Sequence, residues 1–306
     1  MARRIIIDTD PGIDDAIAIL LALASPELEV LGLVAVAGNR PLATTERNAR
    51  ALCALAGRHE LAVYAGCDRP IRRPPFMAVR VHGDSGLGRL ELPPPPTPLR
   101  PGHGVDFLID AIRAAPTRTL TLCPLGPLTN IATALDKAPD IAGRIAEIVL
   151  MGGASRPFGN VTPVAEFNIH VDPDAAAIVF NSGIPITMAP LDVTLPLRTT
   201  PRRLALIRAL GNRSGAAVAE LLRPVAPART PMRLHDPCVI AYLVMPELFR
   251  GRVVNVAIET ESELTIGMSV IDWRGVSGRA PNARVLEKVD VDGFYALLTE
   301  RLANLP

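Results

Sequence analysis

Short apolar runs alternate with helical patterns through the first two thirds of the 306 residues. The first run, Ile5-Ile6-Ile7, ends at Asp8 and is typical of a buried strand. Strands that alternate with helices predict an open α/β (Rossmann-like) fold, in which a mostly parallel central sheet is flanked by helices. The predicted strands span 4–8, 30–36, 61–64, 120–123, 145–151 and 184–189, and the predicted helices 14–24, 44–56, 105–114, 128–135 and 174–181.

The rest of the sequence departs from this alternation. Residues 69–102 contain two proline runs, so we expect a long ordered loop there. A helical pattern then resumes near residue 200 and is broken by the Pro- and Arg-rich stretch 223–233. Residues 253–259 and 265–271 are predicted to pair as antiparallel strands before a terminal helix over 291–303. We expect these insertions at the carboxyl edge of the sheet, where ligands bind in such folds.

Composition narrows the possible classes of function. Hydrophobic residues make up 49% of the chain, and this length is common for one α/β domain, so we predict a single domain over 1–306. Lys+Arg is 32 and Asp+Glu is 31, which leaves no broad positive field for nucleic acid or anionic membranes. No apolar run reaches the ~18 residues of a membrane span, and the four cysteines lack CxxC spacing. We expect a cytoplasmic protein with no nucleic-acid or membrane partner.

Four carboxylates stand close together at the first predicted strand end, turn and helix start: Asp8, Asp10, Asp14 and Asp15. Two like charges ~4 Å apart repel by roughly 4 kcal/mol at an effective dielectric constant of ~20. Amides at a helix N-terminus offset under ~1 kcal/mol for each exposed carboxylate. The remaining repulsion requires protonation or a cation, and ligands that are all oxygen favour Ca²⁺ or Mg²⁺ over zinc.

Two chemistries fit such a cluster. One is phosphoryl transfer of the haloacid-dehalogenase type, which expects a small hydroxyl residue soon after the second Asp and a later Lys. Here Pro11 follows Asp10, and the only lysines are Lys137 and Lys288. The other chemistry is metal-assisted recognition of a sugar diol, with a carboxylate left over to activate water.

Further motifs favour the second chemistry. They are 10–16 (DPGIDDA), 37–39 (AGN), 82–88 (HGDSGLG), 125–132 (LGPLTNIA), 151–154 (MGGA), 159–168 (GNVTPVAEFN) and 235–237 (HDP). In this order, the set resembles the inosine–uridine-type nucleoside hydrolases and covers residues 5 to about 271. The resemblance implies an enzyme that hydrolyses the N-glycosidic bond of ribonucleosides to give ribose and a free base.

The resemblance also implies a Ca²⁺ ion and a set of catalytic residues. The metal ligands would be Asp10, Asp15, Asp236 and the backbone carbonyl of Leu125. Asp14 would be the general base that takes a proton from water, which predicts inversion at the anomeric carbon. His235 would assist the leaving base, and His82 is a second candidate at the pocket mouth. Because the transition state is oxocarbenium-like, an acidic pocket would favour the positive charge that develops on the ribose.

The remaining implied site residues bind substrate. Asn168 would contact the ribose diol, Asn160 and Glu166 the 5′-hydroxyl, Asn39 would lie beside the metal ligands, and Met151 would pack under the ribose. Each has an ordinary alternative: Asn160 and Asn168 as turn residues, Glu166 as a solvated charge, and His235 or Asp236 as a helix cap. His59, His103 and His170 are assigned no role.

One departure from the family pattern bears on specificity. Many members carry a Tyr shortly before the His-Asp-Pro motif, whereas residues 224–234 contain no aromatic residue. We therefore expect a pyrimidine or broad preference, with Phe76, Arg229 or Arg233 in contact with the base. The same absence motivates an alternative, a catalytically weak relative that binds nucleosides or ribose. The resemblance further implies a homodimer or homotetramer that acts in nucleoside salvage.

Overall fold

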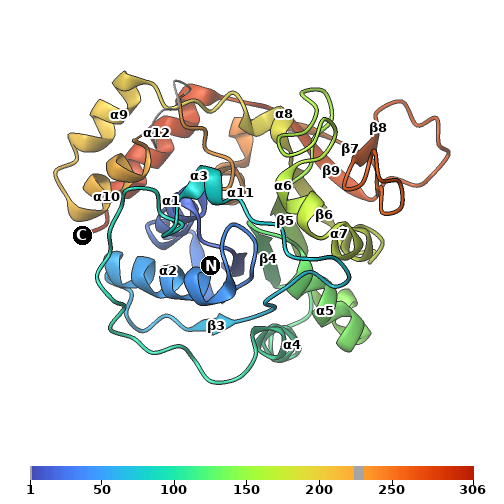
Figure 1. The fold of residues 1–306 in the computed structure, drawn as a ribbon, viewed down its shortest axis with the longest axis horizontal. Coiled ribbons are helices and arrows are strands. Elements are labelled where there is room, and N and C mark those ends of the chain that lie inside the picture. Colours follow the sequence, from blue (N-terminus) through green and yellow to red (C-terminus); the bar gives the residue numbers. More distant parts are fainter. Residues whose placement is uncertain (1, 224–230) are drawn as a thin grey trace.

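The computed structural model describes residues 2–223 and 231–306. Its centre is a nine-stranded sheet in the order β3-β2-β1-β4-β5-β6-β9-β7-β8 (Figure 1). Neighbours from β3 to β9 pair in parallel, whereas β7 is antiparallel to both β9 and β8. The predicted α/β fold with a mostly parallel sheet is confirmed. The strands are β1 (Arg3–Thr9), β2 (Leu28–Ala35), β3 (Val63–Ala65), β4 (Leu120–Pro124), β5 (Glu147–Met151), β6 (Ile186–Ala189), β7 (Phe249–Ile258), β8 (Ser269–Asp272) and β9 (Ala283–Val289).

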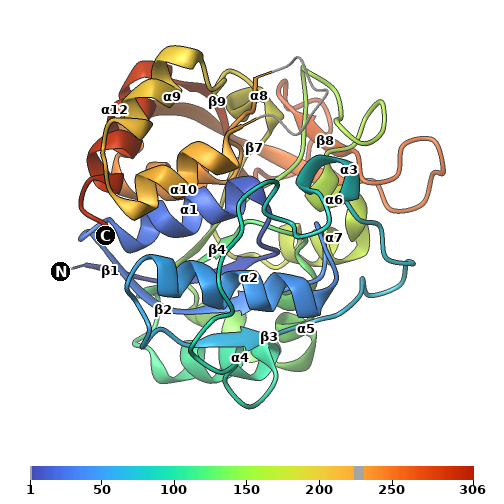
Figure 2. The same cartoon turned by 60° about the vertical axis from the view of Figure 1, so that its left-hand side comes forward.

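Helices cover both faces of this sheet (Figures 1 and 2). Ile5 and Ile7 of β1 belong to one hydrophobic cluster with α1, α2, α10, α11 and α12, whereas Ile6 faces α4, α5 and α7. Successive strand residues point to opposite faces, so three isoleucines serve both layers. The helices are α1 (Ile13–Leu23), α2 (Leu42–Leu55), α3 (Val79–His82), α4 (Gly104–Ala114), α5 (Thr129–Lys137), α6 (Phe167–Val171), α7 (Pro173–Phe180), α8 (Leu191–Thr194), α9 (Pro201–Arg208), α10 (Arg213–Leu221), α11 (Pro237–Val244) and α12 (Val291–Leu302), with 3₁₀ turns at Pro139–Arg144 and Pro246–Leu248.

Strand β9 and the short helices α3, α6 and α8 were not predicted. The predicted antiparallel pair is confirmed as β7 and β8, but β9 lies between β7 and the parallel strands. Exposed Arg284 and Lys288 interrupt the apolar pattern of β9, which is why the sequence did not indicate a strand. The predicted loop over 69–102 contains the short helix α3. Within the described residues, no helix is both long and apolar enough to cross a lipid bilayer.

The order in which the chain adds strands to the sheet reverses at β1. The chain runs from β1 to β2 and β3 on one side, and then returns to β4 on the other side of β1. Ligands bind outside the carboxyl ends of parallel strands at such a switch point. Four predicted site residues end or follow these strands: Asp10 after β1, Asn39 after β2, Leu125 after β4 and Met151 in β5.

Candidate active site

The turn between β1 and α1 holds Asp15 in a fixed position. Asp15 lies in the first turn of α1, and its Oδ2 accepts a hydrogen bond from the Gly12 amide at 3.0 Å, as in a capping box. Its Oδ1 accepts from the Thr9 hydroxyl at 2.6 Å and from the Asp10 amide at 3.3 Å. Because the strand, the turn and the helix are all tied to this carboxylate, its orientation is set by the local fold.

Asp10 is fully buried next to Asp15. Its Oδ2 accepts from the Asn39 amide at 2.6 Å, whereas its Oδ1 has no hydrogen-bond partner in the described part of the chain. The side-chain amide of Asn39 donates to the Asp10 carbonyl at 3.2 Å and to Asp15 Oδ2 at 3.1 Å. A Cβ at Gly38 or Gly126 would overlap the Asp10 carboxylate, so both positions require glycine. A buried carboxylate oxygen without a donor calls for a cation or a proton.

Asp14, Asp15 and Asp236 form a carboxylate cluster. Each contributes one oxygen, and these oxygens lie within 4.8 Å of one another. Burial raises the pKa of Asp14 to about 6, although the charge of His82 opposes the shift. Burial, followed by the charges of Asp14 and Asp15, raises the pKa of Asp236 well above its ordinary value. Ligands that are all oxygen favour a hard divalent ion, so the cluster could hold a metal.

The predicted metal ligands meet only in part in this cluster. Asp15 and Asp236 are members, but the third member is Asp14, which the sequence predicted as the general base. Asp10 stands outside the cluster but close to it, because its charge also raises the pKa of Asp236. Burial, followed by the charge of Asp15, raises the pKa of Asp10 itself.

Asn168 and Glu166 organise the opposite side of the site. The Asn168 side-chain amide donates to the Leu125 carbonyl at 2.6 Å and to the Met151 carbonyl at 3.1 Å. Glu166 caps α6, accepting from the Asn168 amide at 3.0 Å and from the Gly153 amide at 2.9 Å. Burial raises the pKa of Glu166 to about 7 against these hydrogen bonds. Glu166 is therefore not a solvated charge, and Asn168 is a helical residue rather than a turn residue.

Two imidazoles face the same space. His82 Nδ1 accepts from the Ile13 amide at 3.0 Å, and because an amide can only donate, neutral His82 carries its proton on Nε2. His235 Nδ1 lies 2.7 Å from the Thr194 hydroxyl oxygen. Burial lowers the pKa of His82. Burial, followed by the charge of Arg233, lowers the pKa of His235 to about 4.

These side chains line one cavity of about 390 Å³. Of the twelve predicted catalytic, substrate-binding and metal-binding residues, ten line it; Asp10 and Asp15 do not, but both are hydrogen-bonded to Asn39 on its wall. Asp236 makes no side-chain cap to α11, so the helix-cap alternative is not supported. A larger depression of about 1160 Å³, beside residues 65–72, contains none of the predicted site residues. The lining residues are Asp14, Asn39, Ala78, Val81, His82, Leu125, Met151, Asn160, Val161, Glu166, Phe167, Asn168, Pro231, Met232, Arg233, His235 and Asp236.

Comparisons with known proteins show the family of the chain. Residues 5–296 match the family described as inosine-uridine preferring nucleoside hydrolase. The chain belongs to this family. This nucleoside hydrolase is 43% identical to the pyrimidine-specific ribonucleoside hydrolase RihA of Salmonella agona, over 99% of each chain. It is 51% identical to an uncharacterised protein of Schizosaccharomyces pombe, over 99% of this chain and 100% of the relative.

The fold is also similar to that of a solved structure. The purine-preferring ribonucleoside hydrolase from Gardnerella vaginalis superimposes with a TM-score of 0.91 at 36% identity, over 98% of both chains. The nucleoside hydrolase described here is therefore a ribonucleoside N-glycosyl hydrolase. The family match leaves no support for the phosphatase hypothesis.

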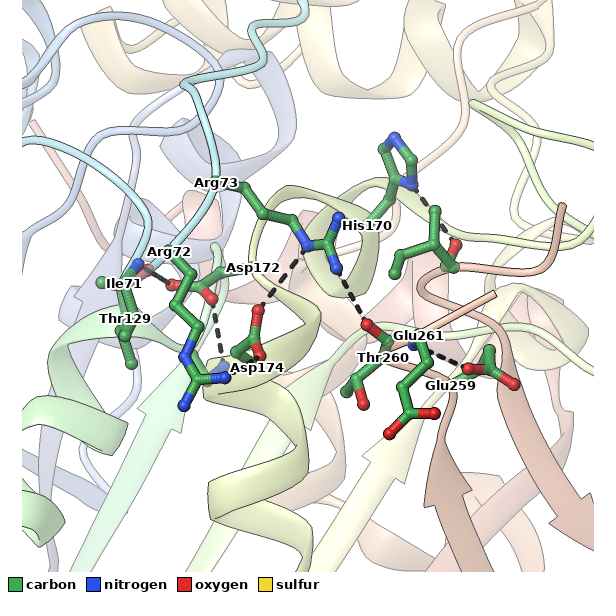
Figure 3. Close-up of polar contacts among 12 residues, drawn as sticks. Ile71, Arg72, Arg73, Thr129, His170, Asp172, Asp174, Glu259, Thr260 and Glu261 are labelled. Atoms are coloured by element: carbon green, nitrogen blue, oxygen red, sulfur yellow. Dashed lines mark hydrogen bonds and ion pairs between the residues drawn. The ribbon is translucent and has the colours of Figure 1, made fainter. Parts of the chain in front are cut away.

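A strap formed by residues 67–78 leads into α3 of the nucleoside hydrolase. Figure 3 shows that it is fastened to α7 and the residue before α7. The Arg73 guanidinium lies 3.6 Å from the Asp174 carboxylate, and the Ile71 amide donates to Asp172 Oδ2 at 2.9 Å. Because Asp172 is also the N-cap of α7, one buried side chain fixes both the strap and the helix.

The three predicted base contacts have different outcomes. Arg233 lines the cavity. Phe76 is not a lining residue, but its ring lies 6.1 Å from that of Phe167, which does line the cavity. Arg229 lies outside the described residues. The sequence prediction missed Phe167, although this residue stands inside the 159–168 motif and could have been found there.

Proposed function

We propose that the nucleoside hydrolase uses a Ca²⁺ ion and the twelve predicted site residues to cleave ribonucleosides, with pyrimidine nucleosides preferred. The observation that carries this proposal is the carboxylate cluster of Asp14, Asp15 and Asp236, of which Asp14 and Asp236 line the same cavity as Glu166 and Asn168. The family and its solved relatives support cleavage of a ribosyl bond at this site.

The donor set fits a calcium ion. Asp10 has an unpartnered buried oxygen among the described residues, and burial together with like charge raises the pKa values of Asp10 and Asp236. Asp15 and the Leu125 carbonyl, which Asn168 orients, would complete the protein ligands. When bound, the ion would offset the carboxylate repulsion and hold two adjacent ribose hydroxyls, because Ca²⁺ accepts six to eight oxygens.

The remaining roles belong to side chains that face the cavity. Asp14 takes a proton from the attacking water, and its raised pKa of about 6 suits a base near neutral pH. Asn160 and Glu166 hold the 5′-hydroxyl, Asn168 the diol, and Met151 packs under the ribose. His82 presents Nε2–H toward the cavity, and together with His235 it assists the leaving base.

A pyrimidine preference has two supports. The relative at 43% identity carries the name pyrimidine-specific. Among the lining residues, Phe167 is the single phenyl ring, so the described cavity does not sandwich a purine between two aromatic side chains. The relative named purine-preferring is less similar, at 36% identity.

A nucleoside panel tests the proposal. Uridine, cytidine, inosine and adenosine are incubated with the protein and Ca²⁺, and released reducing sugar is measured. We expect release of ribose, with uridine and cytidine turned over faster than inosine and adenosine. Calorimetry is run in parallel: tight nucleoside binding without release of ribose would instead establish the binding-only alternative. Faster turnover of inosine than of uridine would refute the pyrimidine preference.

Metal removal should have an effect that depends on pH. In the metal-free protein, burial raises the pKa of Asp8 to about 7, of Asp14 to about 6 and of Glu166 to about 7. The folded state then binds more protons than the unfolded state, so stability is greatest below ~pH 4 and falls as pH rises through 6 to 7. Ca²⁺ binds the ionised carboxylates, so its stabilisation should increase over the same interval.

This prediction is checked by thermal unfolding. The melting temperature is measured with chelator and with excess Ca²⁺ at about pH 5.5 and about pH 8, with KCl at matched ionic strength as the control. We expect the Ca²⁺-induced rise to be clearly larger at the higher pH. A rise that is equal at both values, or larger at the lower value, would contradict the proton-linked site.

Thr194 offers a sharper test of the His235 role. The Thr194 hydroxyl is fully buried in α8 and lies 2.7 Å from His235 Nδ1. Thr194→Val keeps the shape but removes a hydrogen bond of about 1 kcal/mol, so kcat for uridine should fall roughly fivefold to tenfold. Thr194→Ser keeps the hydroxyl and should retain most of the activity. Equal losses in both variants would indicate a packing role instead.

Oligomeric state and cellular role complete the proposal. We propose a homodimer or homotetramer with one domain over 1–306, which acts in cytoplasmic nucleoside salvage. Support for a reducing compartment comes from the four cysteines, which are all free thiols in the structure. Light scattering of the purified protein measures the assembly directly, and a monomer would contradict it.

A further inference from the structure

Arg233 places a positive charge on the wall of an otherwise acidic cavity. Its side chain is part-buried and lines the cavity with His235 and Phe167. No hydrogen bond or ion pair joins the Arg233 guanidinium to any residue in 2–223 or 231–306, and its Nε is buried without a partner there. A guanidinium carries five N–H donors and cannot lose its charge. Within the described part of the chain, its N–H donors are therefore free to bind a ligand.

The backbone fixes the side of the chain on which Arg233 lies. Arg233 forms an isolated antiparallel bridge with Arg198, and the Leu234 amide donates to the Leu197 carbonyl at 3.1 Å. In an extended segment, residues two apart point to the same side. Leu234 is fully buried in the core, whereas Arg233 and His235 both line the cavity. The charge of Arg233 is also close enough to contribute, after burial, to the low pKa of His235.

The charge of Arg233 has the wrong sign to stabilise the sugar. When the glycosidic bond breaks, positive charge develops on the ribose, and carboxylates favour that change. The bonding electron pair moves to the base nitrogen, and resonance spreads it onto the carbonyl oxygens of the base. A positioned cationic donor stabilises such an oxygen most where negative charge develops. The guanidinium donors of Arg233, which lie beside His235, are suited to stabilise the negative charge that develops on the departing base.

We propose that Arg233 binds a carbonyl oxygen of the nucleobase and stabilises the base as it leaves. In this step the C1′–N bond breaks with its electron pair going to the base, and a water oxygen bonds to C1′ while its proton passes to Asp14. The base anion then takes up a proton at nitrogen from solvent, and Asp14 returns its proton to solvent, so that one water is added across the C1′–N bond in total. This inference rests on the proposed function. It assigns to the Arg233 guanidinium the selection of nucleobases that carry a carbonyl oxygen.

The test compares two leaving groups on the same sugar. Uridine needs stabilisation of its departing base, whereas p-nitrophenyl β-D-ribofuranoside releases p-nitrophenolate, a stable anion. For Arg233→Met we expect kcat/KM for uridine to fall about 100-fold, the usual effect of removing one such donor. For the aryl riboside we expect a fall below about threefold. Arg233→Lys keeps the positive charge but loses the paired N–H donors of the guanidinium. Its kcat/KM for uridine should therefore lie between those of wild type and Arg233→Met.

Arg198→Met is the matched control, because Arg198 is the exposed bridge partner of Arg233 and does not line the cavity. It should leave both substrates unaffected. Circular dichroism and melting temperature establish that each variant is folded. Equal falls for uridine and the aryl riboside in Arg233→Met, or no fall for uridine, would overturn the inference. Wild-type protein that cleaves neither riboside would refute the proposed function, and the inference with it.

Discussion

Replacing Asp10 by alanine should abolish calcium binding and nucleoside hydrolysis together. The Asp10 carboxylate is fully buried, with one oxygen held by the Asn39 amide and the other without a partner among the described residues. Removing it deletes a charge that also acts on Asp236. We expect hydrolysis below detection and the calcium-induced rise in melting temperature to disappear.

The same substitution has a second expected result with the opposite sign. In the metal-free state, Asp10 is a buried charge beside Asp15, and burial followed by the charge of Asp15 raises its pKa. Its removal relieves that repulsion, so chelator-treated Asp10→Ala should melt no lower than chelator-treated wild type near neutral pH. Isothermal titration with CaCl₂ measures the lost site. Asp68→Ala, at an exposed carboxylate, is the control. Wild-type calcium affinity in Asp10→Ala would refute its assignment as a ligand.

Replacing Asp14 by alanine should separate catalysis from folding. Asp14 lies in the first turn of α1 and faces the cavity, and its pKa of about 6 keeps it ionised at neutral pH. Loss of a general base costs about 10²–10⁴-fold, so we expect kcat to fall roughly 10³-fold. Because the attacking water is needed whatever the leaving group, uridine and the aryl riboside should be affected equally. This pattern differs from the one expected for Arg233.

The measurement is kcat for both ribosides, together with calcium titration. Asp14 is also a member of the carboxylate cluster, so Asp14→Ala should weaken calcium binding but not abolish it. Saturating Ca²⁺ then distinguishes the two roles. If saturating Ca²⁺ restores kcat to the wild-type value, Asp14 is only a ligand and the assignment as base fails. Asp14→Asn, which keeps the volume, should remain as slow as Asp14→Ala.

The parallel part of the fold could be predicted because its strands are buried on both faces. Ile5, Ile6 and Ile7 are all fully buried, so the run is apolar without interruption and ends at the turn that starts α1. Strand β9 could not be predicted in this way. Its Arg284 and Lys288 are exposed, and its place between β6 and β7 depends on pairing with segments far away in the sequence.

The candidate site could likewise be predicted only in part. Residues inside the motifs, such as Glu166 and Asn168, were predicted to belong to one site, and they do line one cavity. Hydrogen bonds between segments far apart in the sequence could not be predicted. Thr194 is in α8, and nothing in its neighbourhood indicates that its hydroxyl meets His235. Asp172 is likewise a recognisable helix cap, but its hold on the strap through the Ile71 amide is visible only in three dimensions.

The arrangement of the site around β1 has a consequence for how the protein matures. Asp10 leaves the ribosome near the beginning of synthesis, whereas Asp236 emerges after ten of the twelve α-helices have been made. A nascent chain therefore cannot assemble the complete carboxylate set until its last quarter is available. Products truncated before Asp236 should lack the stabilisation expected from the proposed calcium ion, and should be degraded faster than the full-length protein.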